Sequence, residues 1–227
     1  MKKIKFLTLA LLFFIDTNSY AAPCYGTSMP EQYKWNWGFS SNFLAERKLK
    51  DGEGEIRSYQ YFVLGSFGVT NWFCLDGKIG FGDIKQSPPY DEKIEYGTSF
   101  AGGYGFRLKI YENQTWDLRS TVGFHHISVH PHSKIIDGVK NRGVLDDWQG
   151  EIIVSKRIKN FVPYIGCEIS RIDYIHWRDD LRKRKKSDVE AGLVAGIDIY
   201  VTKNIFLNVE SKFFDEKSLS ADVVIIF

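Results

Sequence analysis

The feature that most constrains this chain is an alternation of apolar and polar residues with a period of two, which recurs along its length. In residues 188–201, for example, one face would carry Val189 and Leu193 and the opposite face Asp198. Successive side chains of a β-strand point to opposite faces, so such a segment forms a strand with one apolar and one polar face. The sequence therefore predicts an all-β protein.

The connections between these segments alternate between short turns and longer polar stretches. The short turns are 69–71, 112–114, 159–160 and 202–204. The long loops are 46–55, 83–98, 129–147, 173–187 and, more briefly, 214–218. Tight turns at one end and long loops at the other are typical of closed, antiparallel, up-and-down transmembrane β-barrels. Counting the connections predicts about ten strands, with eight as the alternative.

The ten predicted strands have lengths close to those that a tilted membrane strand needs. They cover residues 34–45, 56–68, 71–82, 99–111, 115–128, 147–158, 161–172, 188–201, 204–213 and 219–227.

The N-terminus predicts a secretory signal. Basic Lys2, Lys3 and Lys5 precede an apolar core of about ten residues, which is too short to span a bilayer. Small residues at Ser19 and Ala21 place the cleavage after Ala21. The expected organisation is a signal peptide in 1–21, a periplasmic segment in 22–33 and a barrel domain in 34–227.

Three observations favour a membrane barrel over a soluble sheet. The chain stops on Phe227 after an apolar strand, and charges of both signs line the face opposite the apolar one. Aromatic residues fall near the predicted strand ends, as interfacial girdles require. They are Trp35, Trp37, Trp72, Phe73, Tyr104, Trp116, Tyr164 and Phe227. We therefore expect the outer membrane of a Gram-negative cell, reached through the periplasm.

Two stretches carry a family resemblance. Residues 68–82 resemble the periplasmic turn and rising strand of small outer-membrane β-barrel proteins, the broad OmpA/opacity-protein class. Residues 207–227 are similar to the last hairpin of that class, and Phe227 resembles the signal that the barrel-assembly machinery recognises. The resemblance implies fold and location, but no catalytic residue. The chain departs from the OmpA type by two additional strands and by having no peptidoglycan-binding domain.

The charged face would line the barrel interior. The predicted network comprises Asp76, Lys78, Arg107, Lys109, Asp117, Arg119, Glu151, Glu168, Glu190 and Glu210. A barrel of about ten strands is only slightly wider than the eight-stranded case that side chains fill. We therefore expect a plugged lumen, with a narrow porin-like channel for small solutes as the alternative.

A basic stretch stands out among the predicted loops. It contains Arg178, Arg182, Lys183, Arg184, Lys185 and Lys186, and it follows Trp177. Outside the cell it would meet the phosphates of lipopolysaccharide or an acidic surface or host glycan. A solvated loop without a ligand is the alternative. The formal charge of the whole chain, +2, gives no reason to expect nucleic acid.

Catalytic and metal-binding constellations are weak. His126 and Ser128 would share a strand face, as in a lipid A deacylase, but no acid is evident beside them. An omptin-like protease would need paired acids and a histidine at the barrel rim, for which Asp146–Asp147, His176 and Asp179–Asp180 are candidates. His125, His126, His130 and His132 cluster without convincing ligand spacing. We expect neither catalysis nor a cofactor or metal.

The three cysteines allow one disulfide. Cys24 would lie before the first strand and Cys74 just after a periplasmic turn, so these two could form a bridge, leaving Cys167 facing lipid. The sequence thus predicts a non-catalytic outer-membrane protein with a structural or adhesive role.

Overall fold

The computed structural model describes residues 26–87 and 93–227. The predicted signal peptide, its cleavage site and Cys24 lie outside these residues. The described residues contain twelve strands and one 3-10 turn. The strands are β1 (Trp35–Lys48), β2 (Glu55–Gly68), β3 (Phe73–Ser87), β4 (Ile94–Asn113), β5 (Leu118–Val129), β6 (Lys134–Ile136), β7 (Val139–Lys156), β8 (Phe161–Arg178), β9 (Leu181–Lys186), β10 (Ala191–Tyr200), β11 (Ile205–Phe213) and β12 (Lys217–Ile226). The turn η1 spans Lys50–Gly52.

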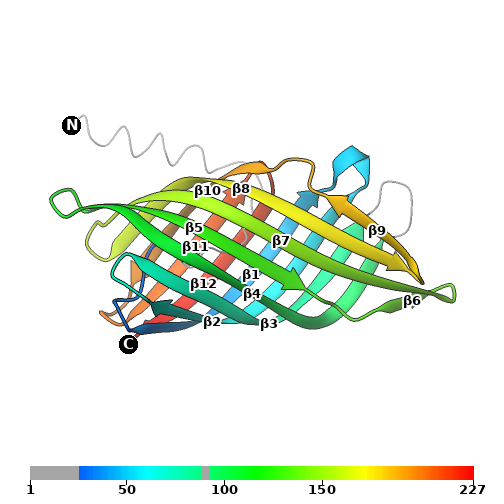
Figure 1. Cartoon of the computed structure of the whole chain (residues 1–227), viewed down its shortest axis with the longest axis horizontal. Helices are drawn as coiled ribbons and strands as arrows, with labels where there is room; N and C mark the ends of the chain where they lie inside the picture. Colours follow the sequence, from blue (N-terminus) through cyan, green and yellow to red (C-terminus); the bar gives the residue numbers. More distant parts are fainter. Residues whose placement is uncertain (1–25, 88–92) are drawn as a thin grey trace.

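Ten of these strands close into one antiparallel barrel (Figure 1). Sequential neighbours pair, β1 pairs with β12 to close the ring, and β7 pairs directly with β5 and β8. The short strands β6 and β9 add to β7 and β8 beyond the barrel. The predicted up-and-down barrel of ten strands is therefore confirmed, and with it the fold of the small outer-membrane barrel class.

The two ends of the barrel differ. The turn end carries the short connections, the N-terminal residues 26–34 and Phe227, and the hairpin end carries β6, β9 and η1 (Figure 1). The stretch 83–98 was expected to be a loop, yet β3 continues to Ser87 and β4 begins at Ile94. Likewise 129–147 contains β6 and the start of β7, and 173–187 contains the end of β8 and β9. These strand extensions carry polar side chains on both faces, as strands that are exposed to water on both sides do. A polar stretch therefore does not by itself mark the end of a strand.

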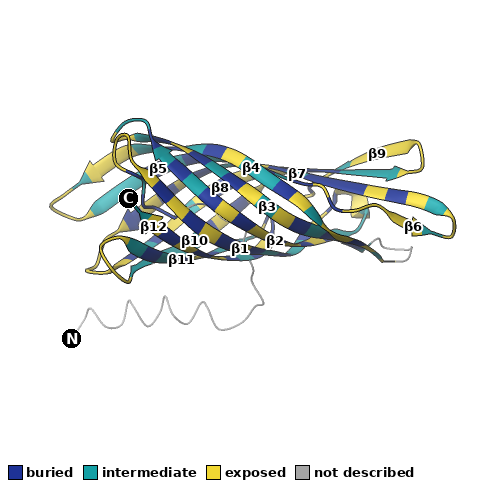
Figure 2. Cartoon of the chain, turned by 90° about the horizontal axis from the view of Figure 1, so that it is seen from below, coloured by how far each residue is buried: buried dark blue, intermediate teal, exposed yellow. Residues whose placement is uncertain are grey.

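Burial alternates along each strand in the sense opposite to that of a soluble protein (Figure 2). Large apolar side chains such as Phe39, Ile79 and Ile169 lie exposed on the outer wall. Charged side chains such as Arg107 and Lys212 are buried inside the barrel. A soluble sheet would bury the apolar face, so the outer wall forms an apolar band of the kind that faces lipid.

Six of the eight aromatic residues predicted to form girdles are exposed, and they are Trp35, Trp37, Trp72, Tyr104, Trp116 and Phe227. Phe73 is half-buried. Tyr164 is instead buried in the interior, where its hydroxyl bonds to Glu210. Within the described chain, no helix has the length and apolarity needed to cross a membrane.

The apolar band predicts a position-dependent cost for charge. Ile152 on β7 is 47% exposed in the middle of the band, and Ile135 on β6 is 72% exposed beyond it. In lipid vesicles, Ile152→Arg is expected to lower the unfolding free energy by about 2–4 kcal/mol, as charges on the lipid face of barrels do. Ile135→Arg should be nearly neutral. Urea unfolding of both variants measures the difference, and equal effects would contradict the placement of the band.

Candidate functional site

The turn end of the barrel is closed by the start of the described chain. Arg107 is buried and holds Asp76 through two hydrogen bonds, Nε to Oδ2 at 2.8 Å and Nη2 to Oδ1 at 2.9 Å. Its Nη1 also donates to the carbonyl oxygens of Gly26 at 3.0 Å and Ser28 at 3.1 Å. One arginine therefore joins the barrel wall to the N-terminal segment.

A second anchor lies beside the first. The backbone N–H and the hydroxyl of Thr27 both donate to Asp198 Oδ2, at 2.9 and 2.6 Å. Gly26 has a φ of +69°, and a Cβ at that position would collide with the Asp198 carboxylate. The segment therefore turns into the barrel mouth, where it blocks access from this end.

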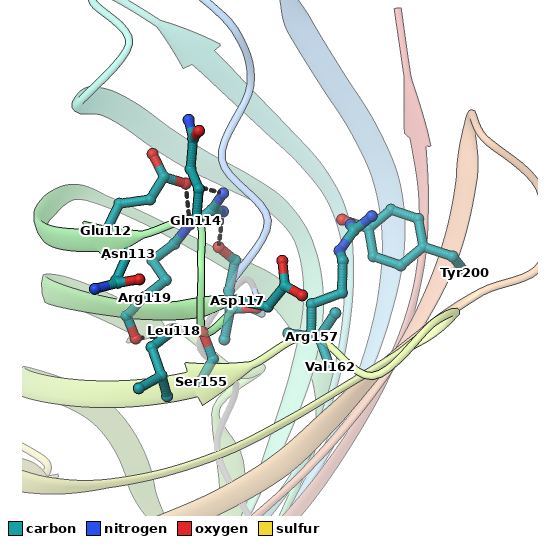
Figure 3. Close-up of a pocket in the computed structure, with 11 residues that line it drawn as sticks. Glu112, Asn113, Gln114, Asp117, Leu118, Arg119, Ser155, Arg157, Val162 and Tyr200 are labelled. Carbon is teal, nitrogen blue, oxygen red and sulfur yellow. Dashed lines mark hydrogen bonds and ion pairs between the residues drawn. The ribbon is translucent and has the colours of Figure 1, made fainter.

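What remains at the turn end is a shallow polar pocket of about 180 Å³ (Figure 3). Glu112 bridges two predicted lumen residues there, accepting from Lys109 at 2.6 Å and Arg119 at 2.8 Å. These two bonds, that of Lys109 first, hold the pKa of Glu112 below its usual value. Arg157 stacks over the Tyr200 ring at 4.4 Å. The basic side chains here are engaged with their neighbours.

The middle of the lumen contains two glutamates that face one another. Glu151 on β7 and Glu168 on β8 are register partners, and like charges directly opposite destabilise a sheet. Each has its own basic partner, because His125 Nε2 lies 3.3 Å from Glu151 and Lys212 Nζ lies 2.5 Å from Glu168. Lys212 also donates to Gln149 at 2.7 Å. The predicted network thus exists, with Lys212 as a central member that the sequence did not suggest.

A third group of charges lies toward the hairpin end. Arg47 is fully buried, and its Nη1 contacts Asp215 at 2.7 Å and Glu216 at 3.0 Å. The sequence predicted Arg47 to lie in a loop, because the alternation of faces breaks after Leu44. In the structure this break is a bulge of β1 between Leu44 and Arg47, after which the alternation resumes on the opposite face. Asp215 and Glu216 lie in a three-residue connection whose polarity predicted exposure, yet both side chains turn inward.

An apolar layer completes the filling of the lumen. It contains Leu44, Leu49, Ile56, Phe62, Leu64, Ile84, Tyr96, Ala101, Ile127, Val129, Leu145, Ile172 and Tyr174. A cavity beside Arg107 and Phe206 has a volume of about 10 Å³, which is room for about one water molecule. Apolar as well as charged side chains therefore occupy the lumen.

Two predicted lumen residues are not in the lumen. Asp117 lies exposed in the turn between β4 and β5, with a φ of 51°. Glu190 is exposed because β10 begins only at Ala191. Of the others, Lys78 is buried, its Nζ lying 5.5 Å from the Phe62 ring centroid, and Glu210 accepts a hydrogen bond from Tyr164 at 2.8 Å.

The basic stretch is a strand rather than a loop, so its side chains divide between two faces. Lys183 and Lys185 face one way, with Arg178, and Lys185 Nζ lies 3.5 Å from Glu53 Oε2. Arg182, Arg184 and Lys186 face the other way, continuous with the outer wall of the barrel. Register adds Lys140, Arg142 and Arg171 from β7 and β8 to that side, together with Asp146 and Asp173. We call these eight residues the basic face.

Trp177 organises the far part of the basic face. It pairs with Arg142 on β7 and with Arg182 on β9. The two guanidinium carbons lie 4.2 and 5.6 Å from its ring centroid. Stacking on an aromatic ring orients a guanidinium while its charge stays available to an anion. Trp177 was singled out from the sequence because it precedes the basic stretch. Nothing in the sequence indicated that Arg142, which is distant along the chain, would stack on it.

Asp173 organises the part of the basic face nearest the barrel. Arg184 donates to it through Nε at 2.9 Å and also through Nη2, and Arg171 Nη2 lies 3.3 Å away. Burial alone would raise the pKa of Asp173, but the hydrogen bond of Arg184 and the charges of both arginines outweigh it and hold this pKa below its usual value. Asp173 is thus an anion that fixes two cations.

Ser128 forms a Ser–His–Asp contact, but not the predicted one. Its Oγ lies 2.8 Å from His130 Nε2 and 2.5 Å from Asp146 Oδ1, whereas His126 stacks on Trp148. In a nucleophilic triad the acid orients the histidine, but here it holds the serine. β5 is paired on both sides at Ser128, so the ladder engages its backbone and offers no oxyanion hole.

The residues considered for a protease do not converge. Asp146 faces outward and its neighbour Asp147 inward, because they are successive residues of one strand. His176 Nε2 lies 3.1 Å from Asn141 Oδ1, and Asp179 accepts from the Lys140 N–H. Among the residues that the structure places, no three His, Cys, Asp or Glu side chains form a metal-binding group.

The cysteines lie on different sides of the wall. Cys74 is buried, with Sγ 3.8 Å from Asp76 Oδ1. Cys167 is exposed on the outer wall, as predicted. The proposed bridge between Cys24 and Cys74 stays a prediction, because Cys24 lies outside the described residues.

Comparison with known proteins adds little to this geometry. No protein-family model and no curated protein sequence matches the chain. Among solved structures, the chain is similar to the transport unit of the autotransporter AIDA-I from Escherichia coli, with 14% identity over 91% of this chain and 92% of that one and a TM-score of 0.42. An outer membrane channel from Pseudomonas putida F1 has 10% identity over 92% and 100%, with a TM-score of 0.45. Such low scores carry no function to this chain.

The lumen predicts an asymmetry between two lysines. Lys212→Met would leave Glu168 buried without its cation and is expected to cost about 3–5 kcal/mol of unfolding free energy. Lys217→Met removes a half-exposed partner of Glu46 and should cost less than about 1 kcal/mol. Denaturant titration of the refolded barrel measures both, and a small effect at Lys212 would mean that the network does not depend on this lysine.

Asp173 predicts a pH dependence of β9. A lowered pKa means that its ion pairs contribute fully above the ordinary aspartate pKa of about 3.9, and that this contribution is lost as pH falls through the lowered value. Amide exchange of residues 181–186, corrected for intrinsic rates, should therefore accelerate below about pH 4 in the native protein. In Asp173→Asn it should be fast at every pH, and pH-independent protection in both proteins would contradict this role.

Proposed function

We propose that the protein is a non-catalytic outer-membrane barrel that presents its basic face to polyanions outside the cell. The observation that carries the proposal is the basic face itself, in which six Arg or Lys side chains share one surface with Asp146 and Asp173. Anionic ligands in reach of such a surface are the phosphates of lipopolysaccharide and the acidic groups of surface or host glycans.

The orientation follows from the two ends of the barrel. In outer-membrane barrels the short turns face the periplasm and the longer connections face outside. That orientation puts the basic face outside the cell and residues 26–34 in the periplasm. In this proposal the protein reaches the outer membrane by a signal peptide in 1–21, which directs export to the periplasm, and by recognition of Phe227 by the barrel-assembly machinery.

A narrow channel for small solutes is the second candidate. The N-terminal segment bound to Arg107 and Asp198 at the turn end and the apolar layer in the lumen argue against it, since an ion would have to pass both. Recordings in planar bilayers separate the two, because a packed barrel gives no steady conductance.

The test of the basic face uses heparin as a polyanion probe. The double variant Arg142→Gln/Arg182→Gln removes the two cations stacked on Trp177 and is expected to weaken binding at low salt about 3- to 10-fold, as loss of two exposed ionic contacts implies. The control is Arg157→Gln/Lys159→Gln, two basic residues at the turn end, which should bind as the native protein does. Equal losses in both variants, or none in the first, would overturn the proposal.

A further inference from the structure

In the contact between Asp173 and its two arginines, some N–H groups of each guanidinium make no hydrogen bond to the carboxylate. The Asp173 side chain is only 6% exposed, whereas those of Arg171 and Arg184 are 45% and 49% exposed. The carboxylate takes Nε and Nη2 of Arg184 and Nη2 of Arg171. Both Nη1 groups and the Nε of Arg171 make no hydrogen bond within residues 26–87 and 93–227. A buried acid therefore fixes two guanidinium groups whose free edges face outward.

The charge of this arrangement is positive. Asp173 has Lys186 directly across the ladder on one side and Asp146 on the other, so the cations Arg171, Arg184 and Lys186 face two carboxylates and the sum is one positive charge. Guanidinium groups suit phosphate oxygens because their paired N–H donors match two oxygens at once. Holding two of them in place lowers the entropy lost when an anion binds.

The position of this cluster selects the source of the phosphate. On the outer wall of β8, Ile165, Cys167, Ile169 and Arg171 follow at every second residue, about 7 Å apart. Ile169 is 71% exposed and belongs to the apolar band. Arg171 is the next side chain on that face, where it pairs with Trp148 of β7. The cluster therefore sits where the apolar band ends, which is the level of lipid headgroups.

A cleft next to the cluster could receive the rest of such a lipid. It lies beneath the connection between β9 and β10, has a volume of about 620 Å³, and is lined by Ile169, Lys186, Val189 and Ala191 among others. Its apolar lining comes from Ile169, Val189 and Ala191, and its charged lining consists of the two lysines Lys50 and Lys186 and the two acids Asp188 and Glu190. An acyl chain lying over Ile165 and Ile169 would bring a headgroup phosphate to Arg171.

We propose that Arg171, Arg184 and Lys186 form a binding site for the phosphomonoester of an outer-leaflet lipid whose acyl chains lie on the wall of β8. This inference rests on the proposed function, since it assigns a ligand to one part of the basic face. It is tested at different residues, because the heparin test substitutes Arg142 and Arg182 at the far part of the basic face.

The experiment measures lipid retained by the full-length, refolded protein. Native mass spectrometry of the protein in detergent is carried out with phosphatidic acid, phosphatidylcholine or inorganic phosphate as probe. The native protein should retain phosphatidic acid at least about tenfold more tightly than phosphatidylcholine, as charge-assisted hydrogen bonds imply. Inorganic phosphate should bind weakly because it lacks the acyl chains.

Two variants localise the site without breaking the fold. Arg171→Gln leaves both Arg184 bonds to Asp173 in place, and Lys186→Gln breaks no ion pair of the described chain. Each should weaken retention of phosphatidic acid about tenfold, whereas heparin binding should fall by less than it does in Arg142→Gln/Arg182→Gln. Arg142→Gln/Arg182→Gln should do the reverse, with normal lipid retention and weaker heparin binding.

The outcomes separate the two proposals. Native retention of phosphatidic acid by Arg171→Gln and Lys186→Gln would overturn the lipid site while the heparin result stands. Equal retention of the two lipids would overturn the phosphate specificity. Binding of inorganic phosphate as tightly as of phosphatidic acid would overturn the assignment to a membrane lipid. Unchanged heparin binding in Arg142→Gln/Arg182→Gln would instead overturn the proposed function.

Discussion

The rest of the structure depends on closure of the backbone hydrogen bonds around the barrel. A strand beside lipid has no water to satisfy its N–H and C=O groups, so every strand must have two neighbours. Pairing of β1 with β12 provides the last of these ladders. Once the ring is closed with apolar side chains outside, the alternate side chains of every strand have only the lumen to enter. The polar interior is therefore a direct consequence of the apolar wall.

The narrowness of the lumen adds a second constraint, which concerns the pairing of the polar side chains inside it. Charged side chains forced into a small volume must find partners, because an unpaired buried charge costs several kcal/mol. The pairs Arg107–Asp76, Lys212–Glu168 and Arg47–Asp215 meet this requirement at three levels along the axis. Glycines make room for them: a Cβ at Gly123 would lie 2.7 Å from Glu151 Oε1. These ion pairs therefore stabilise the barrel from its interior.

Much of this was predictable because a period of two is a strong signal. The strand number, the faces of each strand and the existence of an interior network follow from alternation and from the spacing of turns. The position of Arg47 does not follow, because a single bulge reverses the alternation and the bulge has no signature in the sequence. The inward turn of Asp215 and Glu216 likewise depends on a partner far away in the sequence.

The basic face was predictable only in part, for a related reason. A run of six basic residues is visible in the sequence, but the division of its side chains between two faces depends on β9 being a strand. The contributions of Arg142 and Arg171 depend on the register of β7 with β8. Composition indicated a surface for anions, and pairing decided which cations belong to it.

The same register explains why the Ser128 contact and the arginine cluster occur side by side. Ser128, Asp146, Asp173 and Lys186 form one row across four strands. Two aspartates directly opposite one another repel, so each needs its own compensation. Asp146 receives it from the hydroxyl of Ser128, and Asp173 from Arg171 and Arg184. The serine contact therefore has the same role at Asp146 as the arginine cluster has at Asp173, which is to compensate a negative charge. A hydroxyl compensates Asp146, whereas two arginines compensate Asp173. The positive charge therefore accumulates on the side of β8 and β9.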